Sequence, residues 1–148
     1  MSTRSNIAYK TTDGLIRSIY SHWDGYPDHH GNILIQNYCD IVKIKKLINL
    51  GSISRLGSEI GEQQDFDDRS THNKQWTLAY HRDRGEDLIS DIYHNVSSWI
   101  EYSESYADYN YLWNHDAWYI NMGGQKDHKQ QPTLTLVSDI LINKSVND

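Results

Sequence analysis

The sequence predicts one α+β domain over residues 1–148, with a small, mostly antiparallel sheet of hairpins and two or three helices. Three observations lead to this prediction. The length of 148 residues is that of a single domain. Two pairs of strand-like segments flank tight-turn residues, and a segment with helical spacing lies between the pairs. No repeat, low-complexity tract or evident linker divides the chain.

The N-terminal elements have the clearest local patterns. Residues 7–9 and 15–23 are predicted to form a hairpin around Asp13-Gly14, a dipeptide that favours tight turns. His22 then falls where the second strand ends. Apolar residues at helical spacing predict one bent helix or two short ones between about residues 30 and 50, with Gly51 as the C-cap.

The later elements are predicted from weaker patterns. Residues 51–75 are interpreted as a long loop and residues 76–81 as a central strand. The remaining expected elements are a helix or a strand plus helix over 89–100, a hairpin over 109–120, and a short strand followed by a helix over 133–142.

Composition narrows the possible functions. The net charge is −6, from 14 basic and 20 acidic residues, whereas duplex-binding domains show a basic excess, so direct duplex binding is not expected. Cys39 is the only cysteine, which is typical of a reducing compartment. No signal-peptide core is present at the N-terminus, and no apolar run approaches the roughly 20 residues of a membrane span. A cytoplasmic protein without membrane contact is predicted.

The segment from His22 to Gly31 holds the strongest candidate for a metal site. Imidazole nitrogens and carboxylates are ligands of zinc, and a Gly/Pro turn can fold His29 back onto His22 and Asp24. His81 or Cys39 could supply a fourth ligand, and His72 is a weaker choice. The alternative remains open that Asp24 caps the turn and that the histidines are not ligands.

A second candidate is the stretch around Arg82 and Arg84, which flank Asp83. Two arginines at this spacing could bind a phosphate or carboxylate, or they could form local ion pairs that fix a turn. Four aromatic residues in the C-terminal third are predicted to bind a partner, because Tyr and Trp favour half-buried interfaces. They are Tyr109, Tyr111, Trp113 and Trp118.

Three stretches resemble a family of small phage and prophage proteins. They are Met1-Ser2-Thr3-Arg4-Ser5-Asn6-Ile7-Ala8, His22-Trp23-Asp24-Gly25-Tyr26-Pro27 and Tyr80-His81-Arg82-Asp83-Arg84-Gly85-Glu86, and residues 56–62 belong to the same pattern. The resemblance covers roughly residues 1–90, and His22, Asp24 and His29 fall on it. It implies an accessory protein that inhibits a host defence system. Some proteins of this kind resemble type II-A anti-CRISPR proteins that bind Cas9, and one such inhibitor contains zinc.

Three functions are therefore predicted. The first is inhibition of Cas9 or another defence protein by direct binding, in the cytoplasm of an infected host cell, with a structural zinc site. The second is a metal-dependent hydrolase for a nucleotide or phosphodiester. The third is a sponge that captures a signalling nucleotide. Because the sequence shows no assigned nucleophile and base, binding is favoured over catalysis.

Overall fold

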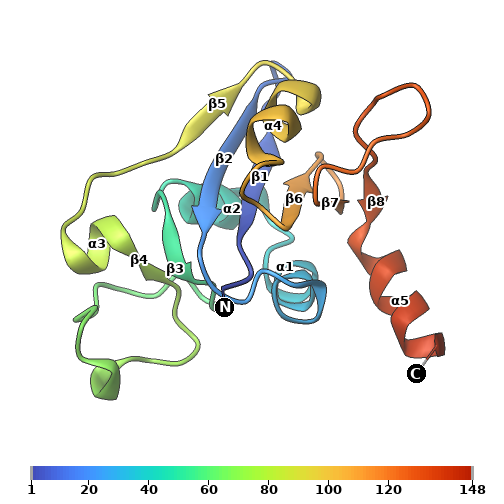
Figure 1. The fold of residues 1–148 in the computed structure, drawn as a ribbon. Coiled ribbons are helices and arrows are strands. Elements are labelled where there is room, and N and C mark those ends of the chain that lie inside the picture. The colour runs from blue at the N-terminus through green and yellow to red at the C-terminus, as the bar shows by residue number, and fades with distance from the viewer. Residues whose placement is uncertain (1, 148) are drawn as a thin grey trace.

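The computed structural model of the chain describes residues 2–147, and side chains as far as residue 142. Within that range the chain forms one mixed eight-stranded sheet and five α-helices, more helices than expected (Figure 1). The predicted α+β class is confirmed. The strands are β1 (Ser5–Lys10), β2 (Ile16–Ser21), β3 (Ile53–Arg55), β4 (Leu78–Ala79), β5 (Asp91–Tyr93), β6 (Tyr109–Trp113), β7 (Trp118–Met122) and β8 (Thr135–Leu136). The helices are α1 (Asn32–Asn37), α2 (Ile41–Ile48), α3 (Tyr80–Arg84), α4 (Val96–Ser103) and α5 (Val137–Asn147).

The two predicted hairpins are confirmed and form the centre of the sheet. Strand order is β4-β3-β2-β1-β6-β7-β8, and β5 pairs with the first half of β2. The β1–β2 and β6–β7 pairs are antiparallel, whereas β1 runs parallel to β6 and β2 runs parallel to β3. Gly14 has a φ of +86° in the first turn, and His115 has a φ of +68° in the second. Positive φ values of this kind produce the turn twist that matches paired strands.

Each face of the sheet is covered by helices. Residues from α1, α2 and α5 pack on the face that carries Ile7, Ile19 and Tyr111. On the opposite face, α4 packs Trp99 and Ile100 against a smaller apolar cluster, and the Trp99 indole donates to the Ser18 hydroxyl at 3.0 Å. Figure 1 shows α4 and α2 on opposite sides of the central strands. The sheet that the two hairpins form therefore carries an apolar core on each of its faces.

The expected segments 30–50, 89–100 and 133–142 form the elements predicted for them, the first as two short helices and the other two as a strand followed by a helix. Residues 51–75 differ from the expected loop, because they include β3 and the 3₁₀ turn η2 (Arg69–Thr71). The strand expected over 76–81 is also shorter. Asp83 Oδ2 accepts a hydrogen bond from the Ala79 backbone N–H at 2.7 Å, and α3 begins at Tyr80, directly after Ala79. His81 therefore lies in a helix.

Three buried asparagines link the central strands. Asn6 on β1 donates to the side chain of Asn110 on β6 at 2.9 Å, and Asn110 lies 3.5 Å from Asn121 on β7. Because each amide has a partner on the neighbouring strand, burial leaves these polar groups satisfied and favours one register. Among residues 2–147, no helix has the length and apolar character needed to cross a membrane.

Candidate functional site

The segment that begins at His22 forms a tightly packed corner. His22 directly follows β2, as predicted, and Asp24 has a φ of +59°, which is uncommon for a residue other than glycine. Gly25 donates its backbone N–H to the Thr3 carbonyl at 2.9 Å. A Cβ at Gly25 would lie 2.7 Å from Cβ of Ser5, so only glycine fits this approach to the N-terminal strand. The corner holds the side chains of residues 22–24 at one end of the sheet.

The predicted zinc ligands do not form a cluster. In the part of the chain that the structure describes, no three His, Cys, Asp or Glu side chains come together in a way that could hold a metal ion. Nδ1 of His22 lies 2.7 Å from the Tyr20 hydroxyl, and Nδ1 of His81 lies 2.7 Å from the Glu86 carbonyl oxygen. The thiol of Cys39, another fourth-ligand candidate, donates to the Ile35 carbonyl at 3.0 Å. Zinc binding stays a prediction.

His29 instead pairs with its neighbour His30. The two Nδ1 atoms are 2.9 Å apart, so one ring donates and the other accepts, and Nε2 of His30 lies 2.8 Å from the Ser21 hydroxyl. Burial lowers the pKa of His30 to about 3. Burial also lowers the pKa of His29, against the opposing charge of Asp24. Both rings are therefore neutral at pH 7 and tie the corner to β2.

The aromatic residues predicted to bind a partner lie mostly in the core. Tyr111, Trp113 and Trp118 are buried, and Tyr109 packs against the same cluster. The Tyr111 hydroxyl donates to the Gly25 carbonyl at 2.6 Å. These rings stabilise the sheet. Their role at an interface stays a prediction, and their packing in the core gives it no support.

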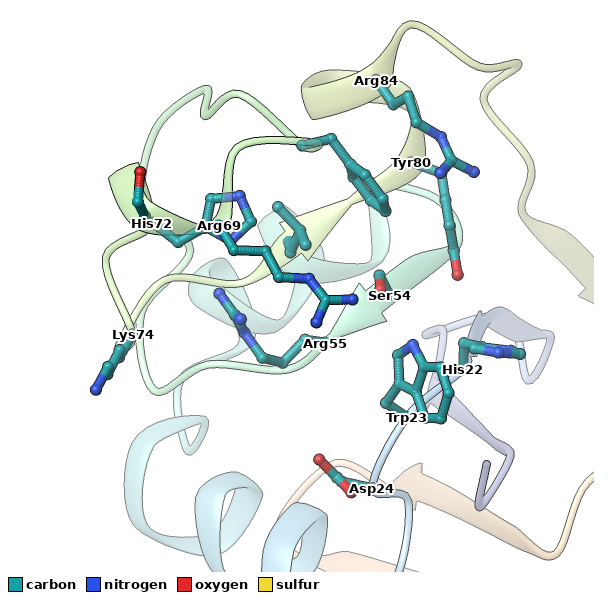
Figure 2. A pocket seen from close by; sticks show the side chains of 13 residues that line it. His22, Trp23, Asp24, Ser54, Arg55, Arg69, His72, Lys74, Tyr80 and Arg84 are labelled. Atoms are coloured by element: carbon teal, nitrogen blue, oxygen red, sulfur yellow. The ribbon is translucent and has the colours of Figure 1, made fainter. Parts of the chain in front are cut away.

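The two motifs singled out in the sequence line the same pocket. This arginine pocket has a volume of about 820 Å³ and lies between the corner at residues 22–24, β3, the loop that contains η2, and the segment from β4 to α3 (Figure 2). The residues that define it here are Trp23, Asp24, Arg55, Arg69, Lys74 and Arg84. The pocket therefore joins segments far apart in the sequence.

The wall formed by the long loop is fixed by Arg82 and Asp83. The Arg82 guanidinium donates to the carbonyls of Ile60 at 2.9 Å and Thr77 at 2.7 Å, and it forms an ion pair with Asp83 at 3.0 Å. Asp83 also accepts from the Gln64 backbone N–H at 2.9 Å. Of the two roles left open for Arg82, the ion pair is the one present in the structure. Arg82 thus holds the loop in place behind the pocket.

The lining of the arginine pocket is basic although the chain is acidic overall. Four cationic side chains line it, and among the described lining residues Asp24 is the only carboxylate. Of these cations, Arg84 forms a salt bridge, with Glu86 at 2.6 Å, whereas Arg69 and Lys74 form none to any described residue. A concave site with clustered positive charge concentrates anions even on an acidic protein.

Arg55 contributes the most specific feature. Its Nε and Nη2 atoms are shielded from solvent, and neither has a hydrogen-bond partner among the described residues. His72, in the same lining, has an unpartnered buried Nδ1. Buried polar groups are nearly always paired, and the Arg55 side chain lines the pocket, so a turn of its guanidinium toward the pocket would let these two donors pair with two oxygens of a phosphate or carboxylate. The arrangement is suited to binding an anion.

Aromatic rings complete the pocket. The Arg84 guanidinium lies 4.2 Å from the centroid of the Phe66 ring and 5.2 Å from that of Tyr80. Trp23 lies at the opposite side of the pocket in Figure 2, and 44% of its surface is exposed. The cation–π contacts with these two rings, together with the salt bridge, hold Arg84 at the pocket wall.

Sequence reasoning identified Arg84 and the corner but missed Arg55 and Arg69. Arg55 is the one charged residue between Lys46 and Glu59, and this isolation is the sequence signal that could have drawn attention to it. Comparison with protein families, with curated proteins and with solved structures finds no match to this chain. The functional conclusion therefore depends on the geometry of the arginine pocket.

Proposed function

We propose that this chain is a binding protein that captures a phosphate-bearing small molecule in the arginine pocket. The observation that supports this proposal is the pair of solvent-shielded, unpartnered donors on Arg55. A phosphate oxygen pair would satisfy both donors in bidentate fashion, and charge-assisted bonds of this kind are among the stronger ones in proteins.

The other cations add charge without adding rigidity. Arg69 and Lys74 are exposed, and Figure 2 shows the Arg69 guanidinium extending from η2 over the pocket. Long exposed side chains lose entropy when they are ordered, so these two residues would strengthen binding less per bond than Arg55. Their main effect would be attraction of the anion, which salt weakens.

This proposal corresponds to the sponge predicted from the sequence. The hydrolase alternative needs a metal held by several ligands, and no three described side chains form such a set. Direct inhibition of Cas9 by a zinc-containing protein stays a prediction, whose test is stable complex formation with Cas9 and inhibition of its cleavage activity. Capture of a small ligand and inhibition of a defence system are compatible, because a defence signal can itself be a phosphate ester.

The test is calorimetric titration of the protein with inorganic tripolyphosphate. We expect saturable binding with one ligand per chain, weakened about tenfold to a hundredfold by Arg55→Ala, as expected for lost bonds to a charged group. Arg55→Lys keeps the charge but loses the paired donors, so it should bind almost as weakly. Lys46→Ala removes an exposed charge from α2, outside the pocket, and serves as the matched control.

Two results would contradict the proposal. One is the absence of any heat or thermal stabilisation with tripolyphosphate at low ionic strength. The other is equal weakening by Arg55→Ala and Lys46→Ala, which would indicate nonspecific charge attraction instead of a site. Circular dichroism and thermal unfolding of each variant establish that the comparison is made between folded proteins.

A further inference from the structure

The arginine pocket is larger than a phosphate group requires. Its volume of about 820 Å³ lies within the range of roughly 300–1,000 Å³ that is typical for sites that hold drug-sized organic ligands. The cations near Arg55 account for one part of the lining, and the remaining lining includes aromatic and small polar residues. A ligand that fills the pocket has an organic portion attached to its phosphate.

The aromatic rings of the pocket differ in how much of their surface is already in contact with other side chains. Phe66 and Tyr80 pack together, with ring centroids 5.4 Å apart, and the Arg84 guanidinium lies against both. Trp23 contacts His22 in an edge-to-face arrangement, with centroids 4.6 Å apart and an angle of 84° between the rings. Because the side chain is 44% exposed, Trp23 has ring surface left for stacking.

The backbone fixes Trp23 relative to Arg55. The Trp23 N–H donates to the Ser54 carbonyl at 3.1 Å, and the His22 N–H donates to the Ile53 carbonyl at 3.1 Å. Arg55 follows Ser54 in β3. The backbone segments that carry the exposed Trp23 indole and the Arg55 guanidinium are therefore joined by hydrogen bonds. A ligand with an aromatic group and a phosphate that spans the pocket would reach both residues once the Arg55 side chain turns its shielded donors toward the ligand.

We propose that the captured molecule is a nucleotide, with its base stacked on Trp23 and its phosphate bound by Arg55. This inference depends on the proposed phosphate-binding function and names the class of ligand. Every nucleobase presents a π face, and the side chain of Asp24 beside Trp23 offers an acceptor for an amino group on the base. Stacking adds affinity that an inorganic polyphosphate cannot gain.

The experiment compares tripolyphosphate with ATP, GTP, CTP and UTP by calorimetric titration without added metal. We expect at least one nucleoside triphosphate to bind the unmodified protein roughly 5- to 150-fold more tightly than tripolyphosphate, the factor that base stacking supplies. Trp23→Leu should remove this advantage and leave the Kd for tripolyphosphate within about twofold. Trp23→Phe retains an aromatic face and should restore part of the advantage, which also controls for a folding defect in the leucine variant.

Tyr102→Leu is the matched control, because Tyr102 is 64% exposed and does not line the arginine pocket. It should leave the preference for nucleotides unchanged. If tripolyphosphate binds and no nucleotide binds more tightly, the nucleotide proposal is wrong and phosphate capture stands. If neither tripolyphosphate nor any nucleotide binds, phosphate capture itself is wrong, and the nucleotide proposal is rejected with it.

Discussion

The buried imidazole of His30 makes the stability of the fold depend on pH in a direction and magnitude that can be worked out. None of its side chain is exposed, and burial lowers its pKa from the ordinary value of 6.5 to about 3. In the unfolded chain the ring takes up a proton near pH 6.5, whereas the folded chain resists protonation until the pH is far lower. The stabilising contribution is therefore complete above pH 6.5 and is lost as the pH falls from 6.5 towards 3.

The magnitude follows from the difference between the two pKa values. Each pH unit in this window lowers the free energy of unfolding by about 1.4 kcal/mol, so at pH 4.5 the loss is about 2.7 kcal/mol. A domain of this size has a total stability of about 5–15 kcal/mol, so the loss is large enough to measure. The pKa of His29 is also lowered by burial, which adds to the loss in the same direction.

The assay is urea unfolding followed by far-UV circular dichroism at pH 7.5 and 4.5, for the unmodified chain and His30→Gln. Glutamine retains hydrogen-bonding groups but does not titrate, so the unmodified chain should lose about 2 to 3 kcal/mol more than the variant. Carboxylates titrate in both proteins and cancel in the comparison. Equal losses would contradict the calculation. So would an NMR titration of the unmodified chain that places the His30 pKa near 6.5, a measurement that does not require the variant to fold.

Four further measurements test the structure. Gly57→Ala would place a Cβ 2.3 Å from the Gln75 carbonyl oxygen, so it should destabilise the chain by about 1–3 kcal/mol in urea unfolding. Asp83→Ala would leave the partly buried guanidinium that supports the pocket wall unpaired and should cost about 3–5 kcal/mol in the same assay. Tyr111→Phe removes the hydrogen bond to the Gly25 carbonyl and should cost about 0.5–1.5 kcal/mol, and no change would mean that water replaces it. Chelation tests the predicted zinc site: a structural zinc ion predicts a lower Tm after chelation together with one zinc ion per chain by elemental analysis, and an unchanged Tm with no zinc would contradict that prediction.

The parts of the fold that sequence predicts well are those with local causes. Asp13-Gly14 forms the first hairpin turn because a positive φ is readily available to glycine. Gly51 has a φ of +76°, but α2 ends at Ile48 with Asn49 as its C-cap, so the C-cap predicted at Gly51 lies two residues too far along the chain. The segment after Gly51 has weaker local signals. β3 has three residues and β4 has two, and they exist because each pairs with a strand that lies elsewhere in the sequence. Short strands of this kind leave no periodic pattern to detect.

The candidate site shows the same division. Arg84 and the corner at residues 22–24 stand out locally by residue type, so sequence identifies them, although it cannot tell that they line one pocket. Arg55 gains its importance from what surrounds it, since two of its donors have no hydrogen-bond partner among the described residues. Tyr111 and the two tryptophans of the second hairpin, which residue type alone favoured for an interface, are buried in the core. Side-chain direction in a strand depends on its partners, which composition does not specify.

The parallel pairing of β1 with β6 has a consequence for how the chain is made. Asn6 and Asn110, which form a hydrogen bond across this pair, are 104 residues apart in the sequence. The first hairpin emerges early during synthesis, but one edge of β1 stays unpaired until most of the chain has been translated. Contacts of such long range slow folding, and an unpaired edge next to apolar residues favours aggregation. Chains truncated before β6 would therefore expose the centre of the sheet, so translation through residue 113 sets the earliest point at which the whole of β6 can pair with β1.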